Sequence, residues 1–203
     1  MRFKPCVAIS YDSATYHDLK TYLKHDCNID LMKFTPEEFF RLPVSFFHDP
    51  STRGYQYINL ISQDFELREK ICRHLDTNQA DRFSYVHPSS TVVGATVGQG
   101  VFVYPNCVIY PSANVGNDVV IHGQTLIAHQ AVIGQGTYIS GKVVVAGGTS
   151  IGAYCQLGLD ATVFDKITIV DHVLIGACSI VKKSILQSGT WATVFNKRTQ
   201  KLK

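Results

Sequence analysis

The eighteen residues from Val119 to Gly136 read VVIHGQTLIAHQAVIGQG, and they contain the pattern that decides the fold. An aliphatic residue returns at every sixth position, and this spacing continues without a slip from Val97 to Val181. The position two before each of them is usually small or apolar, so two inward-facing residues flank one outward-facing residue, as in a β-strand. The next three residues must turn the chain. A short strand and a corner, repeated without insertion, indicate a parallel β-helix.

Glycine often occupies the first position of these corners. We interpret this as a need for dihedral angles that other residues tolerate poorly. The glycines concerned are Gly98, Gly116, Gly134, Gly152, Gly158 and Gly176. The phase of the repeat slips by one residue between Val86 and Val97, which predicts one tight turn early in the column.

This pattern resembles the hexapeptide repeat of bacterial acyltransferases, which fold as a left-handed β-helix. The left hand is implied by the resemblance, because general rules for crossover connections favour the right hand. In that family three hexapeptides make one triangular coil, so residues eighteen apart stack on one another. Such a column buries its core only where coils stack, and it therefore needs a cap at each end.

The first 84 residues follow a different pattern, in which strands and helices alternate. Strands are expected at residues 6–10, 29–34 and 57–61, and helices at 13–25, from Thr35 onward and at 64–75. Thr35-Pro36-Glu37-Glu38 is typical of a helix start, with an N-cap followed by proline and glutamate. The alternation implies a small parallel sheet. We predict an α/β domain of βαβαβ order, then the left-handed β-helix, then a basic tail; the ranges are 1–84, 85–187 and 188–203.

This domain order resembles one subgroup of the family, whose members acetylate amino sugars on nucleotide carriers or sialic-acid-like sugars. Its best-known members act in bacillosamine synthesis. The resemblance implies acetyl-CoA as the cofactor and a homotrimer with each cofactor between neighbouring columns. It also implies acetyl transfer to an amino or hydroxyl group of a bacterial surface-glycan sugar, as in lipopolysaccharide biosynthesis. N- and O-acetylation, and acetyl and longer acyl donors, stay open.

The first strand-to-helix turn departs from the subgroup. A glycine-rich turn there usually lets backbone amides approach the nucleotide, whereas this chain has no glycine at that place. The candidate substrate-binding residues in the turn are Ser10, Tyr11, Asp12 and Ser13. Their hydroxyl groups could bind a sugar beside a helix N-terminus, but Asp12 would repel phosphates. A plain turn with Ser13 as the N-cap is the alternative.

A corner of the column carries the candidate catalytic histidine. His129 lies two residues after inward-facing Ile127, so its side chain should point outward. Eighteen residues later the same edge carries Gly147 and then Gly148, and this bare backbone suits a thiol-linked cofactor. Imidazole titrates near neutrality and can take a proton from an attacking amine or hydroxyl. The resemblance places the family's general base at His129.

The resemblance also assigns roles to other positions. The family's carboxylate partner of the histidine is replaced by Gln130, which can orient the ring but supplies no charge. His122 and Tyr138 align with positions near the acetyl group or the acceptor, and Tyr138 replaces a histidine common there. Ala177 matches a family glycine whose amide approaches the cofactor. Gly147 and Gly148 offer bare backbone to the cofactor, and Lys182 and Lys183 could meet the phosphates of coenzyme A. Backbone amides near Gly147 would hold the oxyanion. A solvated basic tail is the alternative for the lysines.

The composition excludes some classes of function. The net charge of +3 is too small to argue for nucleic acid as a partner. No segment has the apolar length of a membrane span, and the N-terminus lacks the apolar run of a signal peptide, so we expect a cytoplasmic protein without membrane insertion. The six cysteines have no metal-type spacing, and we expect them to be buried free thiols.

Two other functions remain as alternatives. A metallo-enzyme on the same column would need three converging histidines. Those within the repeats are His122, His129 and His172, and their spacing gives no pair on adjacent coils of one edge, so no metal site is predicted. A non-catalytic or weakly active protein that binds a sugar or coenzyme A is favoured by Gln130 and by the missing glycine-rich turn.

Overall fold

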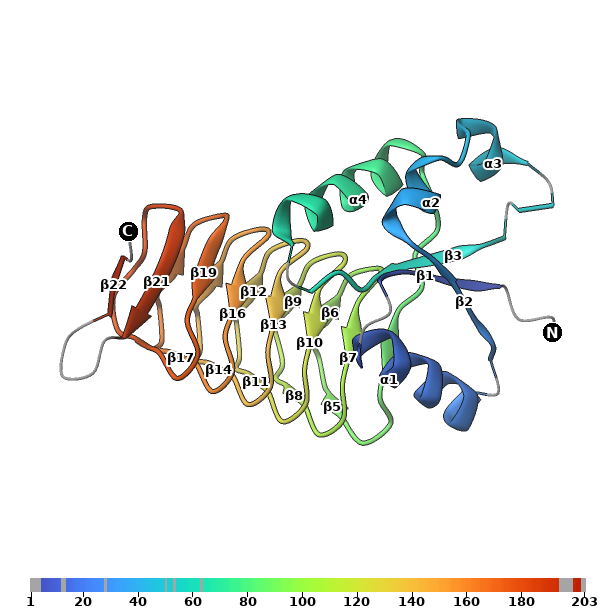
Figure 1. Cartoon of the computed structure of the whole chain (residues 1–203). Coiled ribbons are helices and arrows are strands. Elements are labelled where there is room, and N and C mark those ends of the chain that lie inside the picture. The colour runs from blue at the N-terminus through green and yellow to red at the C-terminus, as the bar shows by residue number, and fades with distance from the viewer. Residues whose placement is uncertain are drawn as a thin grey trace. The chain divides into compact units, whose positions relative to one another are not determined.

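The computed structural model describes residues 5–11, 14–27, 29–49, 51–52, 54–62, 64–193 and 199–201. The chain divides into two compact units, Met1–Ser84 and Tyr85–Lys203. The first is a small sheet with helices, and the second is a column of stacked coils (Figure 1). Within the described parts of the chain, no helix has the length and apolar character required to span a membrane.

The first unit contains a parallel sheet with the strand order β2-β1-β3, as predicted from the alternation of strands and helices. Its strands are β1 Cys6–Ile9, β2 Leu31–Phe34 and β3 Gln56–Asn59. Its helices are α1 Ala14–Tyr22, which continues as the π-helical turn η1 Leu23–Cys27, α2 Pro36–Phe40, α3 Val44–His48 and α4 Phe65–Thr77. Helix α3 was not predicted, because five residues are too few to show a helical period.

Local sequence signals fix where two of these helices begin. The Thr35 side chain accepts a hydrogen bond from the Glu38 amide, and the Glu38 carboxylate accepts one from the Thr35 amide. This capping box starts α2, as expected. The Asp64 carboxylate accepts from the Leu67 amide and starts α4 in the same way. Both helix ends therefore already use side-chain oxygens of this chain.

The second unit is a parallel β-solenoid of the left-handed β-helix type with about six turns. Its strands stack in three sheets, which we call the first, second and third faces. The first face contains β4 Tyr85–Val86, β7 Phe102–Val103, β10 Val120–Ile121, β13 Tyr138–Ile139, β16 Gln156–Leu157, β19 Val173–Ile175, β21 Gly189–Thr193 and β22 Thr199–Lys201. The second contains β5 Thr91–Val92, β8 Val108–Ile109, β11 Leu126–Ile127, β14 Val144–Val145, β17 Thr162–Val163 and β20 Ile180–Val181. The third contains β6 Thr96–Val97, β9 Asn114–Val115, β12 Val132–Ile133, β15 Ser150–Ile151 and β18 Thr168–Ile169.

The register confirms coils of eighteen residues. Ile121 pairs with Ile139, one coil later, and Val97 pairs with Val115. Val86 pairs with Val103 instead, which is one residue fewer. The predicted slip therefore lies between β5 and β6, where Gly94 turns the chain with φ +60°.

The glycines at the first corner position are required by close packing between coils. The prediction that they are required by unusual dihedral angles was wrong. Positive φ falls on the third corner residue, and glycine is not required there: φ is 63° at Gln124 and 58° at Lys142. At the first position, a Cβ on Gly158 would lie 2.5 Å from the Ala177 amide nitrogen, and one on Gly116 would lie 2.9 Å from that of Gln135. Glycine is needed because the next coil's backbone passes too close for a side chain.

We expect Gly134→Ala to destabilise the column, because the added carbon would overlap the backbone of Gly152. Overpacking of this kind typically costs about 1–3 kcal/mol of unfolding free energy. Thermal or urea unfolding would measure it, with Gly54→Ala as the control, since nothing lies within 4 Å of a Cβ at Gly54. Equal melting temperatures for the two variants would contradict the close-packing explanation.

The interior of the column is aliphatic, with polar positions that bond to the next coil. The buried hydroxyls of Thr125, Thr137 and Thr149 donate to carbonyls of the following coil over 3.1, 2.9 and 2.8 Å. Cys107 and Cys155 are buried free thiols, as expected, and burial raises the pKa of Cys155 to about 11. Cys27 and Cys178 are exposed, so the expectation of buried cysteines was wrong for these two.

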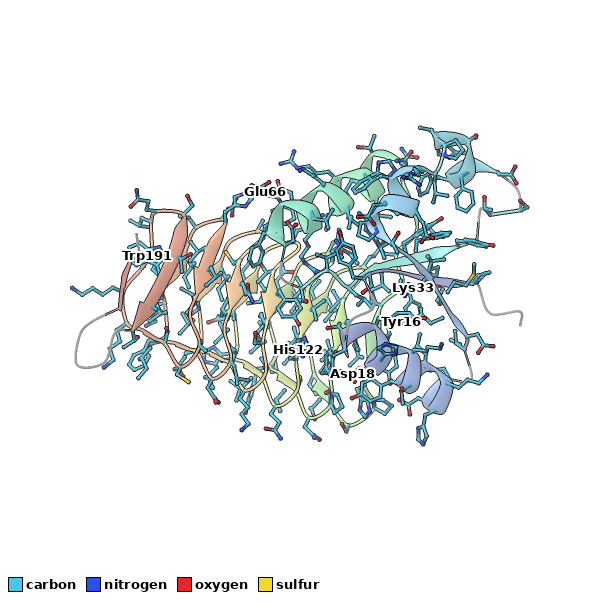
Figure 2. All side chains as sticks on the ribbon, in the orientation of Figure 1. Tyr16, Asp18, Lys33, Glu66, His122 and Trp191 are labelled. Atoms are coloured by element: carbon cyan, nitrogen blue, oxygen red, sulfur yellow. The ribbon has the colours of Figure 1, made fainter. Side chains whose placement is uncertain are left out.

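The column does not end where the hexapeptide spacing ends. Residues 189–193, which the sequence placed in a basic tail, form β21, and β21 pairs in parallel with β19. Trp191 packs against the column's core, and its Nε1 donates to the Gln187 carbonyl. Figure 2 shows Trp191 at the C-terminal end of the column. A strand with a different spacing thus caps the core after Val181.

Candidate functional site

The corners of successive coils line up as three edges of the column. The first edge joins the first and second faces and contains residues 104–106, 122–124, 140–142, 158–160 and 176–178. The second edge joins the second and third faces and contains 110–112, 128–130, 146–148, 164–166 and 182–184. The third edge contains 98–100, 116–118, 134–136, 152–154 and 170–172.

His129 lies on the second edge, directly over the backbone of Gly147. A Cβ on Gly147 would lie 2.6 Å from Cε1 and 2.7 Å from Nε2 of the imidazole. The Gly148 amide donates to the His129 carbonyl over 3.0 Å. His129 is exposed. An exposed imidazole therefore lies directly against the main chain of Gly147.

The second edge changes from glycine to lysine along the column. Gln130, Gly148 and Lys166 stack at the third corner position, each with positive φ. The Cγ of Lys166 lies 3.5 Å from where a Cβ of Gly148 would be. Lys182 and Lys183 follow one coil later and are exposed, and the Lys182 ammonium lies 5.5 Å from the centre of the Phe164 ring. Sequence reasoning missed Lys166, although its spacing of eighteen from Gly148 would have found it.

His122 and Tyr138 lie on the first edge and the first face, across the second face from His129. The Tyr138 hydroxyl and His122 Nε2 are hydrogen-bonded. The imidazole stacks on the Tyr104 ring, with centroids 4.1 Å apart and planes at 18°. His122 is half-buried and Tyr138 is buried. Figure 2 marks His122 on the column. Ala177 also lies on the first edge. Within a single chain, the second face therefore separates these three residues from His129.

The candidate substrate residues of the first unit follow β1 at its carboxyl end. The buried Ser10 hydroxyl donates to the Tyr11 carbonyl over 2.6 Å, and the exposed Tyr11 hydroxyl bonds to Glu37 Oε1 at 3.2 Å. Loss of hydration, and then the carboxylates of Glu37 and Asp64, raise the pKa of Tyr11. Asp12 and Ser13 lie outside the described residues. Two carboxylates, those of Glu37 and Asp64, therefore lie near the Tyr11 hydroxyl, and the cationic Arg41 lies near Glu37.

Neither unit shows an arrangement for a metal among the residues described. In those ranges, no group of three or more histidine, cysteine, aspartate or glutamate side chains could hold a metal ion. The reactive groups of the described column edges are an imidazole, a tyrosine–histidine pair, backbone amides and lysines.

Residues 94–129 match the family model described as bacterial transferase hexapeptide, six repeats. The match covers strands β6 to β11 of the column. A search of curated proteins finds no match to this chain.

Solved structures of three other proteins share the fold of this chain. PerB from Caulobacter crescentus, solved with CoA and GDP-perosamine, has a TM-score of 0.80 at 20% identity over 93% of this chain and 94% of that chain. The acetyltransferase domain of PglB from Neisseria gonorrhoeae, solved with acetyl coenzyme A, has a TM-score of 0.79 at 16% identity over 99% and 100%. WeeI from Acinetobacter baumannii has a TM-score of 0.75 at 12% identity over 93% and 96%.

Proposed function

We propose that the protein is an acetyl-CoA-dependent acetyltransferase that acts on an amino or hydroxyl group of a bacterial surface-glycan sugar. The observation that carries this proposal is the His129 ring seated on the backbone of Gly147 at an edge of hexapeptide repeats. The complexes of PerB with CoA and of the PglB domain with acetyl coenzyme A support the choice of donor.

The second edge fits a coenzyme A molecule. A Cβ at Gly147 would overlap the His129 ring, so glycine is what allows the imidazole to lie against the main chain. A thioester arm would pass along the exposed side of that ring. Lys166, Lys182 and Lys183 continue the same edge and could bind phosphates as point charges. Acetyl-CoA supplies an acyl group on a sulfur that leaves as a thiolate.

In this mechanism His129 acts as the general base. Its imidazole takes a proton from the acceptor's nitrogen or oxygen as that atom bonds to the acyl carbon. Amides near Gly147 stabilise the charge that develops on the acyl oxygen. The carbon–sulfur bond then breaks, the sulfur keeps the electron pair, and His129 returns the proton to it. Gln130 holds the imidazole orientation without adding charge.

We further propose a homotrimer built on the second face. Its outward-facing side chains are apolar at Val108, Leu126, Val144 and Ile180 and polar at Thr91 and Thr162, and 44% of Ile180 is exposed. The third face is mostly polar, with outward-facing Thr96, Asn114, Ser150 and Thr168. An exposed apolar face of this kind is typical of a protein–protein interface. In a trimer, each of the three copies would place this face toward the three-fold axis.

This symmetry would join two edges that a single chain keeps apart. A three-fold rotation places the first edge of one copy against the second edge of the next. His129 would then face His122 and Tyr138 of its neighbour, and Ala177 would approach the same cofactor. The proposed site is therefore shared between two copies.

The first unit is proposed to hold the acceptor sugar. Both a nucleotide-linked amino sugar and a sialic-acid-like sugar remain candidates. Tyr11 and Glu37 offer a hydroxyl and a carboxylate that could bind sugar hydroxyls, whereas the negative charge of Glu37 and Asp64 disfavours a diphosphate. Thiol release from acetyl-CoA, measured with a panel that contains each sugar with and without its nucleotide, would distinguish these acceptors.

Coenzyme A should raise the melting temperature, because a ligand that binds only the folded state stabilises it by about 2.7 kcal/mol at one hundred times its Kd. Acetyl-CoA should then release thiol in the presence of an accepted sugar from the panel. No thermal shift at millimolar coenzyme A would contradict the proposal. A shift without thiol release from any sugar would favour the non-catalytic binding protein.

A further inference from the structure

We propose that Arg68 is a positioning residue of the acceptor site, because it holds the chain that leaves β3 at the edge of the sheet where we place the sugar. This inference rests on the proposed function, in which the first unit holds the acceptor, and it deepens that proposal by naming a residue that shapes the site. Arg68 does not itself touch the sugar. It acts through the connection from β3 to α4, which the structure describes at residues 60–62 and at 64.

The Arg68 side chain is buried and bonds to the main chain at the end of β3. It comes from the first turn of α4, which packs beside β3 (Figure 1), and 1% of it is exposed. Its Nη1 donates to the Asn59 carbonyl over 3.0 Å and to the Ile61 carbonyl over 2.8 Å. Asn59 is the last residue of β3, and Ile61 follows it by two. One nitrogen thus sets the direction in which the chain leaves the strand.

The buried Asn59 side chain holds the same segment a second time. Its Oδ1 accepts from the Ile61 amide over 3.2 Å. Its Nδ2 donates to the Arg68 carbonyl over 3.0 Å and to Cys72 Sγ over 3.4 Å. Asn59 and Arg68 therefore each donate to the other's carbonyl. This reciprocal pair joins the end of β3 to α4 and leaves both main-chain groups of Ile61 bonded to side chains.

Burial of an arginine at this place needs a reason beyond packing. A guanidinium is costly to remove from water unless its N–H groups are hydrogen-bonded, and an apolar side chain of similar volume often packs a helix on a sheet equally well. Here Nη1 bonds to two carbonyls of one short segment, those of Asn59 and Ile61. The arrangement therefore favours a single conformation of the chain that leaves β3.

The topology of the sheet places this segment beside the expected ligand. In open parallel sheets, ligands bind beyond the carboxyl ends of the strands, at the point where the strand order reverses. With the order β2-β1-β3, this point lies between β1 and β3. The chain after β1 reaches Tyr11, and the chain after β3 reaches Asp64, whose carboxylate lies near the Tyr11 hydroxyl. The connection that Arg68 holds therefore forms one side of the place where we expect the acceptor.

The test compares the KM for the best acceptor of the sugar panel among variants, with thiol release from acetyl-CoA as the assay. Arg68→Met keeps an unbranched stem without donors, and its kcat/KM for the acceptor should fall by roughly 10–10²-fold, mainly through KM, as when a bound group is misplaced by about 1 Å. The KM for acetyl-CoA should not change. Arg68→Lys should recover part of the loss, because an ammonium has N–H donors for both carbonyls.

Asn59→Ala breaks the same connection from the strand side. It should raise the KM for the acceptor in the same direction as Arg68→Met. The double variant should lose less than the product of the two single effects, because both side chains belong to one hydrogen-bond network. If Arg68→Met does not fold, Asn59→Ala and Arg68→Lys provide the same comparison.

Arg73→Met is the matched control, with the same substitution on the same helix. Arg73 is exposed, and its Nε donates to the Glu69 carboxylate over 2.9 Å, so both KM values should equal those of the wild type. Melting temperatures show which variants are folded. An unchanged acceptor KM in the folded variants, with only kcat lowered, would overturn the inference and leave the proposed function standing. A wild type without transfer activity would overturn both.

Discussion

Replacing His129 with alanine should lower turnover by roughly 10²–10⁴-fold, the usual share of general-base catalysis. Without the imidazole, the acceptor's proton would lose the base that lies directly over Gly147. Coenzyme A binding should survive, because the cofactor would rest mainly on backbone and lysines. Steady-state kinetics with the best acceptor from the sugar panel, together with calorimetry for coenzyme A, would separate the two effects.

His172→Ala is the control for that change. His172 is also an exposed corner histidine, but it lies on the third edge, so its loss should leave turnover unchanged. Gln130→Ala should cost far less than His129→Ala, because an amide orients the ring without stabilising its charge. If His129→Ala keeps full activity, His129 is not the base and the mechanism is wrong.

A charged substitution on the outward side of the second face should disrupt the proposed trimer. Leu126→Glu places a carboxylate at the middle of the apolar patch, and in a trimer three such charges would meet near the axis without water. We expect the trimer to dissociate and turnover to fall at least as far as in His129→Ala, because each site would lose its neighbour. Light scattering and the thiol-release assay would measure the two outcomes.

Thr168→Glu is the matched control on the exposed third face. It should remain a trimer with normal activity, since that face points to solvent in the proposed assembly. A Leu126→Glu protein that stays trimeric would show that the second face is not the interface. A monomeric variant with full activity would show instead that the site is complete within one chain.

The periodic part of the chain was the easiest to predict. A spacing of six fixes strands, corners and coils, and it also placed His129 over Gly147. The same spacing could not explain the corner glycines, because the distance between coils is a property of the stacked backbones. It also ended at Val181, whereas β21 continues the first face with a different spacing.

Contacts that depend on side-chain direction could not be predicted. Tyr138 and His122 are sixteen residues apart, so neither the period of six nor that of eighteen pairs them. Only the rotamer of the tyrosine brings its hydroxyl across to the previous coil. Likewise, the sequence could not show that the Glu37 and Asp64 carboxylates lie near the Tyr11 hydroxyl.

A crystal structure with coenzyme A bound would show directly whether the second edge holds the cofactor between two copies. We predict that the pantetheine arm lies along Gly147 and Gly148, with its sulfur between His129 of one copy and Tyr138 of the next. A coenzyme A molecule held within one copy, or with its sulfur away from His129, would contradict it.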